Sequence, residues 1–363
     1  MKNTIGNSFT LTLFGESHGK AIGAVVDGVP SGIEVNEDFI APQMEKRKGI
    51  NSISTPRREA DEVKILSGVF EGRTTGTPVC FMIENADTKS KDYSLTKDLA
   101  RPGHADFTAE MRYDGFQDYR GGGHFSGRIT APLVAAGALA ISMLKSKGIE
   151  IGTHISSLGE IKDRAFENYG EDIKQLEALE MPVLCEKARE EMLSYIEKAK
   201  AEGDSVGGTL TTVVTGMPAG VGEPWFDNVE SMLAHGLFSI PGIKGIEFGK
   251  GFDFAKMKGS EANDELRVCD GEITTVTNNN GGINGGITNG MPLEFTLAVK
   301  PTPSIYKKQS TVNFKLKENA DLEIKGRHDP AIIHRARVVA DSVTALILCD
   351  LLMMRFGTQF FGK

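Results

Sequence analysis

The residues best suited to chemistry in this chain lie in glycine-rich loops that also carry histidine, serine and arginine. Residues 15–19 read Gly-Glu-Ser-His-Gly and follow an alternating apolar stretch. The pattern fits G-x-S-x-G, the nucleophile elbow of serine hydrolases, but that elbow needs a helix next and residues 21–26 favour a strand. Ser17 and His18 are neighbours, so in an extended chain their side chains should diverge and form no dyad. A plain turn, or a loop that presents His18 to a ligand, are the other interpretations.

A second histidine loop spans residues 101–106, Arg-Pro-Gly-His-Ala-Asp. Pro102 and Gly103 fix a turn, and Arg101 places a permanent cation near His104. A single loop histidine is most often a surface residue, and that interpretation stays open for this loop taken alone. Histidines with arginine and glycine neighbours in separate loops favour a functional role.

A third loop, residues 120–128, reads Arg-Gly-Gly-Gly-His-Phe-Ser-Gly-Arg and runs into an apolar helix. Its glycines allow close backbone approach, the helix start offers N–H groups, and Arg128 offers a fork for phosphate or carboxylate. This combination predicts an anion site; the alternative is a tight entry to a buried helix. The chain has no Walker A motif and no G-x-G-x-x-G after a strand, so the usual ATPase and Rossmann sites lack their residues.

Two further segments carry polar groups beside prolines. Residues 300–304, Lys-Pro-Thr-Pro-Ser, can meet a phosphate or a ring carbonyl, although an edge-strand exit explains the prolines equally well. In residues 326–330, Gly-Arg-His-Asp-Pro, Asp329 either caps the last helix or forms an acid–base and anion site with Arg327 and His328.

Together the loops supply Arg, His, Ser and Asp, but no obvious nucleophile. The seven histidines show no HExxH pattern or carboxylate cluster, so we expect no metal site. We therefore expect a polyanionic small substrate, with a phosphorylated cofactor as a further option. The alternative classes are a serine hydrolase that uses Ser17 and an anion-binding module without turnover.

The elements that must position these loops follow from apolar periodicity. The helix after residue 130, with Thr130 as expected N-cap, has almost no polar face and belongs inside the protein. The polar segment 262–290 is expected to be a long functional loop. These patterns favour one α+β domain over residues 1–363, with sheets that cover internal helices. Strands are expected at 9–13, 22–26, 63–70, 79–83, 209–215 and 293–299, and helices at 36–47, 130–147, 183–200, 227–237 and 330–356.

Composition and charge narrow the class of protein further. The 363 residues include 41 Lys+Arg and 49 Asp+Glu, a net charge of −8, which argues against a general nucleic-acid binder. Usage of 40% hydrophobic and 25% charged residues excludes a wholly disordered, collagenous or coiled-coil chain. The N-terminus lacks a signal-peptide run and the longest apolar stretch, 343–354, is too short to span a bilayer. We expect a cytoplasmic protein whose four widely spaced cysteines, Cys80, Cys185, Cys269 and Cys349, are reduced.

The same motifs resemble the chorismate synthase family. Residues 15–30 are similar to its first signature, 122–130 to its second and 327–330 to its third. Four more segments keep the family's order and spacing, so the resemblance covers nearly the whole chain. These segments are residues 57–59, 67–72, 101–106 and 300–302.

The resemblance implies a lyase of aromatic amino-acid biosynthesis that converts 5-enolpyruvylshikimate 3-phosphate to chorismate, with loss of phosphate and a ring hydrogen. Reduced FMN is required although there is no net redox change. A single β-α-β sandwich domain, chorismate synthase-like, and a homotetramer are also implied. Some members reduce the flavin with their own NADPH-dependent activity and others rely on an outside reductase; we expect the latter here.

The resemblance also implies residue roles. His18 is expected to protonate the departing phosphate, His104 to protonate or stabilise the reduced flavin, and Asp329 to act through flavin N5 in removing the ring proton. Residues that match the flavin site are His124, Phe125, Ser126, Gly242, Gly285, Lys300, Pro301, Thr302, Pro303, Ser304 and Arg327. Residues that match the substrate side are Ser17, Lys46, Arg47 and Arg128. Departures from the family pattern occur at Ser52, His124, Phe125, Pro303 and Asp341, where many relatives have Arg, Arg, Ser, Ser and Glu.

Overall fold

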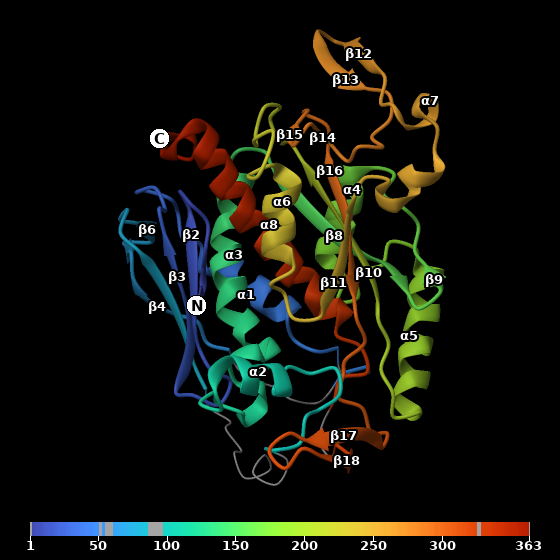
Figure 1. The fold of residues 1–363 in the computed structure, drawn as a ribbon. Coiled ribbons are helices and arrows are strands. Elements are labelled where there is room, and N and C mark those ends of the chain that lie inside the picture. Colours follow the sequence, from blue (N-terminus) through green and yellow to red (C-terminus); the bar gives the residue numbers. More distant parts are fainter. Residues whose placement is uncertain (1, 51–52, 55–60, 86–96, 325–327, 363) are drawn as a thin grey trace.

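The computed structural model describes residues 2–50, 53–54, 61–85, 97–324 and 328–362. Within these residues two five-stranded sheets face each other, and two long helices lie between them (Figure 1). The order is β1-β2-β3-β7-β4 in the first sheet and β11-β16-β10-β8-β9 in the second, with antiparallel pairing throughout. The expected α+β sandwich of antiparallel sheets around internal helices is confirmed.

Some strands of both sheets alternate more and less buried side chains, as half-covered strands do. In β2, for example, Leu11 points into the core while Thr10 and Phe14 face outward. The first sheet contains β1 (Thr4–Ile5), β2 (Thr10–Gly15), β3 (Ala21–Asp27), β4 (Lys64–Ser67) and β7 (Val79–Glu84). The second contains β8 (Glu150–Leu158), β9 (Ile161–Lys162), β10 (Gly208–Thr215), β11 (Ile243–Phe248) and β16 (Leu293–Val299).

The internal helices α3 (Thr130–Lys145) and α8 (Ile333–Phe356) pack side by side, α3 against the first sheet and α8 against the second (Figure 1). Both are apolar around most of their circumference because protein surrounds them on several sides. At Gly137 the helices approach so closely that a Cβ would lie 2.2 Å from Cβ of Ser342. Helices α1 (Glu37–Lys46) and α6 (Val229–Leu237) pack beside them in the same layer.

The remaining described elements lie at the ends and on the outer side of the second sheet (Figure 1). Helices α4 (Tyr169–Ala178) and α5 (Glu186–Ala201) contact β8 and β9, respectively. The short helices are α2 (Asp106–Tyr113), α7 (Gly259–Ala262), η2 (Arg120–Phe125), η3 (Gly127–Ile129), η4 (Gly251–Lys256) and η5 (Thr358–Phe360). The hairpins are β5 (Val69–Phe70) with β6 (Arg73–Thr74), β12 (Leu266–Cys269) with β13 (Glu272–Thr275), β14 (Ile283–Asn284) with β15 (Ile287–Thr288), and β17 (Gln309–Asn313) with β18 (Glu318–Leu322).

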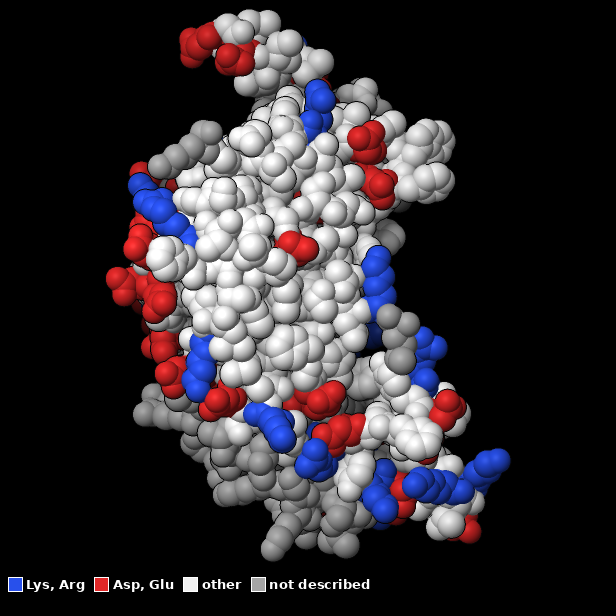
Figure 2. Space-filling view, turned by 90° about the vertical axis from the view of Figure 1, so that its left-hand side faces the viewer, with Lys and Arg blue, Asp and Glu red and all other residues white. Residues whose placement is uncertain are grey.

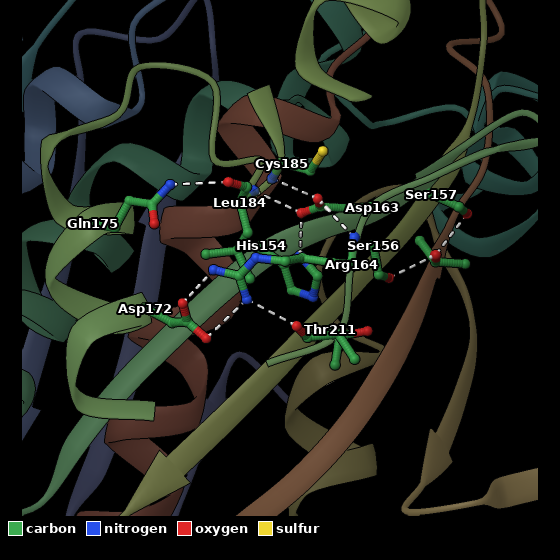
Figure 3. Close-up of polar contacts among 12 residues, drawn as sticks. His154, Ser156, Ser157, Asp163, Arg164, Asp172, Gln175, Leu184, Cys185 and Thr211 are labelled. Carbon is green, nitrogen blue, oxygen red and sulfur yellow. Dashed lines mark hydrogen bonds and ion pairs between the residues drawn. The ribbon is translucent and has the colours of Figure 1, made fainter. Parts of the chain in front are cut away.

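A buried polar network attaches the covering segments to the second sheet (Figure 3). His154 Nδ1 of β8 lies 2.7 Å from Asp163 Oδ2, and the amides of Leu184 and Cys185 donate to the same carboxylate at 2.7 and 2.8 Å. Burial acts to raise the pKa of Asp163, but the bonds from His154 and the two amides hold it below its usual value. This histidine is therefore a satisfied core residue that joins α4, α5 and the sheet.

Several predicted elements occur with the expected type. Helix α1 is capped by Asn36, whose Oδ1 accepts from the Phe39 amide at 3.2 Å. The alternation at residues 9–13 forms β2, and Gly357 ends α8 as expected. The four cysteines, all within the described residues, are free thiols.

Other predictions were wrong in their details. The strand expected over 63–70 breaks at Gly68, whose φ of +82° separates β4 from β5. Thr130 is not the cap of α3, because η3 precedes it and its Oγ1 donates to Gly127 O at 2.6 Å from within the helix.

Three further boundaries also differ from the sequence prediction. Asn228 rather than Asp227 caps α6, and α8 begins at Ile333 rather than at Pro330. The segment 262–290 is not a single loop, since it contains the hairpins β12–β13 and β14–β15.

One described helical stretch, Gly127–Lys145, is long and apolar enough to cross a membrane by length and composition. In the structure 89% of its apolar window is buried inside the protein. This stretch, made of η3 and α3, is thus a core helix of the sandwich.

We expect Gly137→Ala to lower the free energy of unfolding by about 1–3 kcal/mol, because the added methyl group overpacks the α3–α8 contact. The measurement is the midpoint of chemical denaturation. Gly259→Ala in α7 is the matched control, since its Cβ would meet nothing within 4 Å. Equal midpoints for the two variants would show that the helices are not held this closely.

Candidate active site

Three consecutive glycines in η2 bring the two predicted histidine loops together. Their φ angles are 58°, 88° and 54°, a run that other residues adopt only with strain. A Cβ at Gly121 would lie 2.1 Å from Cε1 of His18. A Cβ at Gly122 would lie 3.3 Å from Cε1 of His104. The imidazoles of His18 and His104 therefore pack against two adjacent glycines of the same backbone segment.

The loop between β2 and β3 is a turn in which Ser17 and His18 do contact each other. Ser17 Oγ lies 3.1 Å from His18 Nδ1 and 3.2 Å from Arg120 O, and the Ser17 amide donates to Gly123 O at 3.1 Å. The expected divergence of the two side chains was wrong, because it assumed an extended chain. Strand β3 rather than a helix follows, so the loop lacks the context of a nucleophile elbow.

His104 is oriented by a carboxylate from the start of α2. Its Nδ1 lies 2.9 Å from Asp106 Oδ1, and Arg101 donates to both Asp106 oxygens at 2.8 and 2.7 Å. Burial acts to raise the pKa of Asp106, but the bonds from Arg101 and His104 hold it well below its usual value. Arg101 Nη2 also lies 3.0 Å from His104 Nδ1, so this nitrogen faces the Arg101–Asp106 pair and Nε2 lies on the side of Gly122.

The segment that begins at Lys300 packs against the His104 loop. Lys300 Nζ donates to Gly103 O at 2.5 Å, and a Cβ at Gly103 would lie 3.2 Å from Cβ of Pro303. The Lys300 amide donates to Gly242 O at 2.9 Å. The structure therefore places two predicted flavin-site residues, Lys300 and Pro303, against the His104 loop, and a third, Gly242, is bonded to Lys300.

Two more predicted flavin-site residues, His124 and Phe125, end η2. His124 Nδ1 lies 2.7 Å from Gly15 O, which ties η2 to the end of β2. Phe125 is 39% exposed and makes an edge contact with Tyr113, at 6.1 Å between ring centroids. An exposed aromatic face beside the glycine run is available for a planar ligand.

One predicted flavin-site residue, Gly285, lies apart from these groups. Gly285 lies in the turn of the β14–β15 hairpin, at the end of the molecule opposite α2 (Figure 1). Arg327 lies outside the described residues, as do Ser52 and the motif 57–59. Their roles stay predictions.

Arg47 and Arg128 of the predicted substrate side meet on a third residue, Asp61. Arg47 Nη2 lies 2.9 Å from Asp61 Oδ2, and Arg128 Nη1 lies 2.5 Å from Asp61 Oδ1. Ser126 accepts from the Arg128 amide at 3.3 Å and so caps η3 in front of the cluster. Asp61 was not predicted from the sequence; its signal there is its place two residues after the motif at 57–59.

Lys46, the neighbour of Arg47, points elsewhere. It lines a small pocket with Arg337 and Asp341, and burial, with repulsion from Arg337, lowers its pKa to about 8. Asp341 accepts from Thr153 Oγ1 at 2.6 Å, and burial raises its pKa. The structure does not bring Lys46 to the other predicted substrate residues.

Asp329 forms an ion pair with Arg335 across the start of α8. Ile332, not Asp329, occupies the N-cap position of α8, so the capping interpretation was wrong. Burial lowers the pKa of Arg335 to about 10, with repulsion from Arg47 as a further cause. This repulsion indicates that Asp329 and Arg335 belong to the same charged region as Arg47 and Asp61.

A cavity lies next to Asp329, and two polar atoms on the segments around it lack partners among the described residues. Its lining includes Ser304, Tyr306, His328 and Asp329. His328 Nε2 and Thr302 Oγ1 are buried without a hydrogen-bond partner among the described residues. Because buried polar atoms are normally paired, both atoms are candidates for contacts with a bound molecule.

The assembled groups suit proton transfer beside a polyanion. Two imidazoles meet at the glycine run, and nearby guanidiniums pair with the carboxylates of Asp61 and Asp106. Among the described residues no group of three or more His, Cys, Asp or Glu is placed to hold a metal ion.

Comparisons with known proteins point to one family. The chorismate synthase family model matches residues 9–353. A chorismate synthase from Thermococcus gammatolerans is 46% identical over 351 residues, 96% of this chain and 97% of the relative. One from Methanosarcina barkeri is 47% identical over 360 residues, 98% and 97% of the two chains. A solved crystal structure of a chorismate synthase is similar with a TM-score of 0.76 and 29% identity, over 97% of this chain and 94% of that one.

We expect Asp106→Asn to lower the free energy of unfolding by about 1–3 kcal/mol at pH 7, through loss of its bonds to Arg101 and His104. Because the folded pKa of Asp106 lies below the unfolded value, its contribution is present above about pH 4 and is lost as pH falls through the folded pKa. The measurement is denaturant unfolding from pH 7 down to pH 2.

The difference between wild type and Asp106→Asn should therefore shrink as the solution becomes acidic. The control is Asp253→Asn, which breaks the exposed pair with Lys256 and should change little at any pH. A difference that stays constant with pH would contradict the ionised Asp106.

Proposed function

The chain belongs to the chorismate synthase family, and on that premise we propose how its residues carry out the family's reaction. The reaction removes phosphate from 5-enolpyruvylshikimate 3-phosphate and gives chorismate, the last common step of the shikimate pathway, so the protein is a carbon–oxygen lyase. The observation that carries the proposal is the meeting of His18 and His104 at Gly121 and Gly122.

We infer that reduced FMN binds beside His104, and the residues there fit it. The unpartnered Thr302 Oγ1 and His328 Nε2 suit polar atoms of a flavin, and exposed Phe125 suits its ring. When bound, reduced FMN supplies the electron-rich ring that assists loss of phosphate without net oxidation. Residues that would hold it are His124, Phe125, Ser126, Gly242, Lys300, Pro301, Thr302, Pro303, Ser304 and Arg327. Gly285 lies at the opposite end of the molecule from α2, so we leave it out of the proposed flavin set.

The substrate carries a phosphate and two carboxylates, and we assign its recognition to Arg47, Arg128 and Ser17. A guanidinium can donate two parallel hydrogen bonds to one phosphate or carboxylate group. These bonds replace the hydrogen bonds to water that the substrate loses on binding. The guanidiniums also create a local positive region in a chain whose net charge is −8. Lys46 points away from this region in the structure, so we leave it out of the proposed substrate set.

His18 is the proposed general acid for the departing phosphate. Negative charge develops on the phosphate oxygen as the bond breaks, and a nearby imidazolium stabilises it and then gives up its proton. Histidine suits this step because its ordinary pKa lies near neutral pH. The contact with Ser17 Oγ orients the ring.

His104 and Asp329 are the other two residues with proposed roles in proton transfer. The contacts of His104 Nδ1 with Asp106 and Arg101 keep Nε2 directed toward the proposed flavin side. Asp329 takes up the ring proton, and Arg335 orients its carboxylate for that step. The hydrogen lost from the ring and the proton given to phosphate thus balance in the overall elimination.

We further propose that the enzyme is a cytoplasmic homotetramer. The outer face of the first sheet carries few charged side chains away from its rim (Figure 2), and includes the exposed apolar residues Phe14 and Leu66. Such a face suits burial against a second copy. Light scattering should give four times the chain mass, and Leu66→Lys should lower it while Leu316→Lys on the β17–β18 hairpin should not. A wild-type monomer would contradict this assembly.

The experiment that tests the function is an anaerobic assay of chorismate formation from 5-enolpyruvylshikimate 3-phosphate. Product should form with reduced FMN and not with oxidised FMN. His18→Ala should lower turnover by about 10²-fold or more, the usual weight of a general acid. The matched control is His235→Ala on α6, an exposed histidine whose loss should leave turnover unchanged.

The rival classes give different results. A serine hydrolase would be labelled at Ser17 by a fluorophosphonate, and we expect no labelling. A flavin-binding module would retain FMN without turnover. A near-wild-type rate for His18→Ala would contradict the general-acid assignment.

A further inference from the structure

Asp61 connects the two arginines that we assign to the substrate. Each of its carboxylate oxygens takes one guanidinium, Arg47 at 2.9 Å and Arg128 at 2.5 Å. The three side chains are 5%, 15% and 8% exposed, in the order Asp61, Arg47 and Arg128. The cluster is thus a largely desolvated bridge rather than a surface ion pair.

Further hydrogen bonds orient the two guanidiniums around this bridge. Arg47 Nη1 donates to Thr130 Oγ1 at 2.9 Å, at the start of α3. Arg128 Nε donates to Asn85 Oδ1 at 2.9 Å. Asn85 Nδ2 in turn donates to Glu16 O and Gly19 O, both at 3.0 Å, on the loop that carries His18. The bridge therefore lies in a chain of contacts that reaches from α1 to the general acid.

Two guanidiniums this close together in a partly buried site repel each other, and the repulsion is stronger than it would be in water. A carboxylate between them offsets that repulsion and fixes both planes through directional bonds. Burial acts to raise the pKa of Asp61, but Arg47 and Arg128 outweigh burial and lower it, so the carboxylate is ionised at neutral pH.

We propose that Asp61 is a positioning residue for substrate binding, which sets the spacing and orientation of Arg47 and Arg128. Each guanidinium carries five N–H donors in a rigid fork, so holding one edge on Asp61 aims the others. The anionic groups of the substrate then meet two guanidiniums that are already in place. This inference rests on the proposed substrate roles of Arg47 and Arg128.

The test is the steady-state kinetics of Asp61→Asn in the anaerobic assay with reduced FMN. We expect the KM for 5-enolpyruvylshikimate 3-phosphate to rise about tenfold or more, with kcat changed by less than about threefold and FMN affinity unchanged. The matched control is Asp172→Asn, which also breaks a buried carboxylate–arginine pair, with Arg164 at 2.5 Å in the network of Figure 3. It should leave KM unchanged.

A double-mutant cycle separates a failure of this inference from a failure of the proposed site. If Arg128→Ala leaves KM unchanged, the assignment of Arg128 to the substrate fails. If Arg128→Ala raises KM but Asp61→Asn does not, only the role of Asp61 fails. If Asp61 acts through Arg128, adding Asp61→Asn to Arg128→Ala should raise KM by much less than it does in the wild type.

If Asp61→Asn does not fold, the KM of Asp61→Glu provides the test instead. Asp61→Glu retains the charge but lengthens the stem, so it should bind substrate several-fold more weakly than wild type. Wild-type KM in Asp61→Glu would overturn the proposal, because the spacing would then not matter. A lower KM in either variant would also overturn it, since Asp61 would then compete with the substrate as an internal anion.

Discussion

The absence of side chains at three consecutive positions, Gly121, Gly122 and Gly123, is the constraint on which the site depends. Their positive φ angles turn the backbone of η2 so that His18 and His104 both lie against it. Any Cβ at Gly121 would occupy the place of the His18 ring. The glycine run leads through η3 into α3, and α3 is buried inside the sandwich. The rigid core thus supports loops whose precise approach the chemistry needs.

Charge is organised around this backbone in two sets. In the first set, Arg101 and Asp106 contact His104 and orient it. In the second set, Asp61 pairs with both Arg47 and Arg128. In each set an aspartate carboxylate accepts hydrogen bonds from an arginine guanidinium. These groups are partly shielded from solvent, where charged hydrogen bonds are strong and directional. A polyanionic substrate therefore meets cations that are already oriented, although the whole chain is acidic.

Much of the fold and the site followed from the sequence, for identifiable reasons. Alternation and capping residues are local signals, so β2, β3 and the Asn36 cap of α1 were predictable. The contact of Ser17 with His18 was not, because it depends on a turn held by Gly123 O. Asp61 was missed because its partners, Arg47 and Arg128, are distant in sequence and meet only in the fold. Lys46 illustrates the same limit: adjacent residues at a helix end point to different environments, and periodicity does not say which one faces the site.

The central claim is that close approach at Gly121 positions His18 for catalysis. The most direct test compares turnover of Gly121→Ala with that of Gly72→Ala, whose glycine also has a positive φ but has no atom within 4 Å of the added Cβ. With equal thermal stability, Gly121→Ala should lose about 10²-fold or more in kcat, as does removal of the general acid, while Gly72→Ala stays near wild type. Near-wild-type turnover in Gly121→Ala would contradict the account.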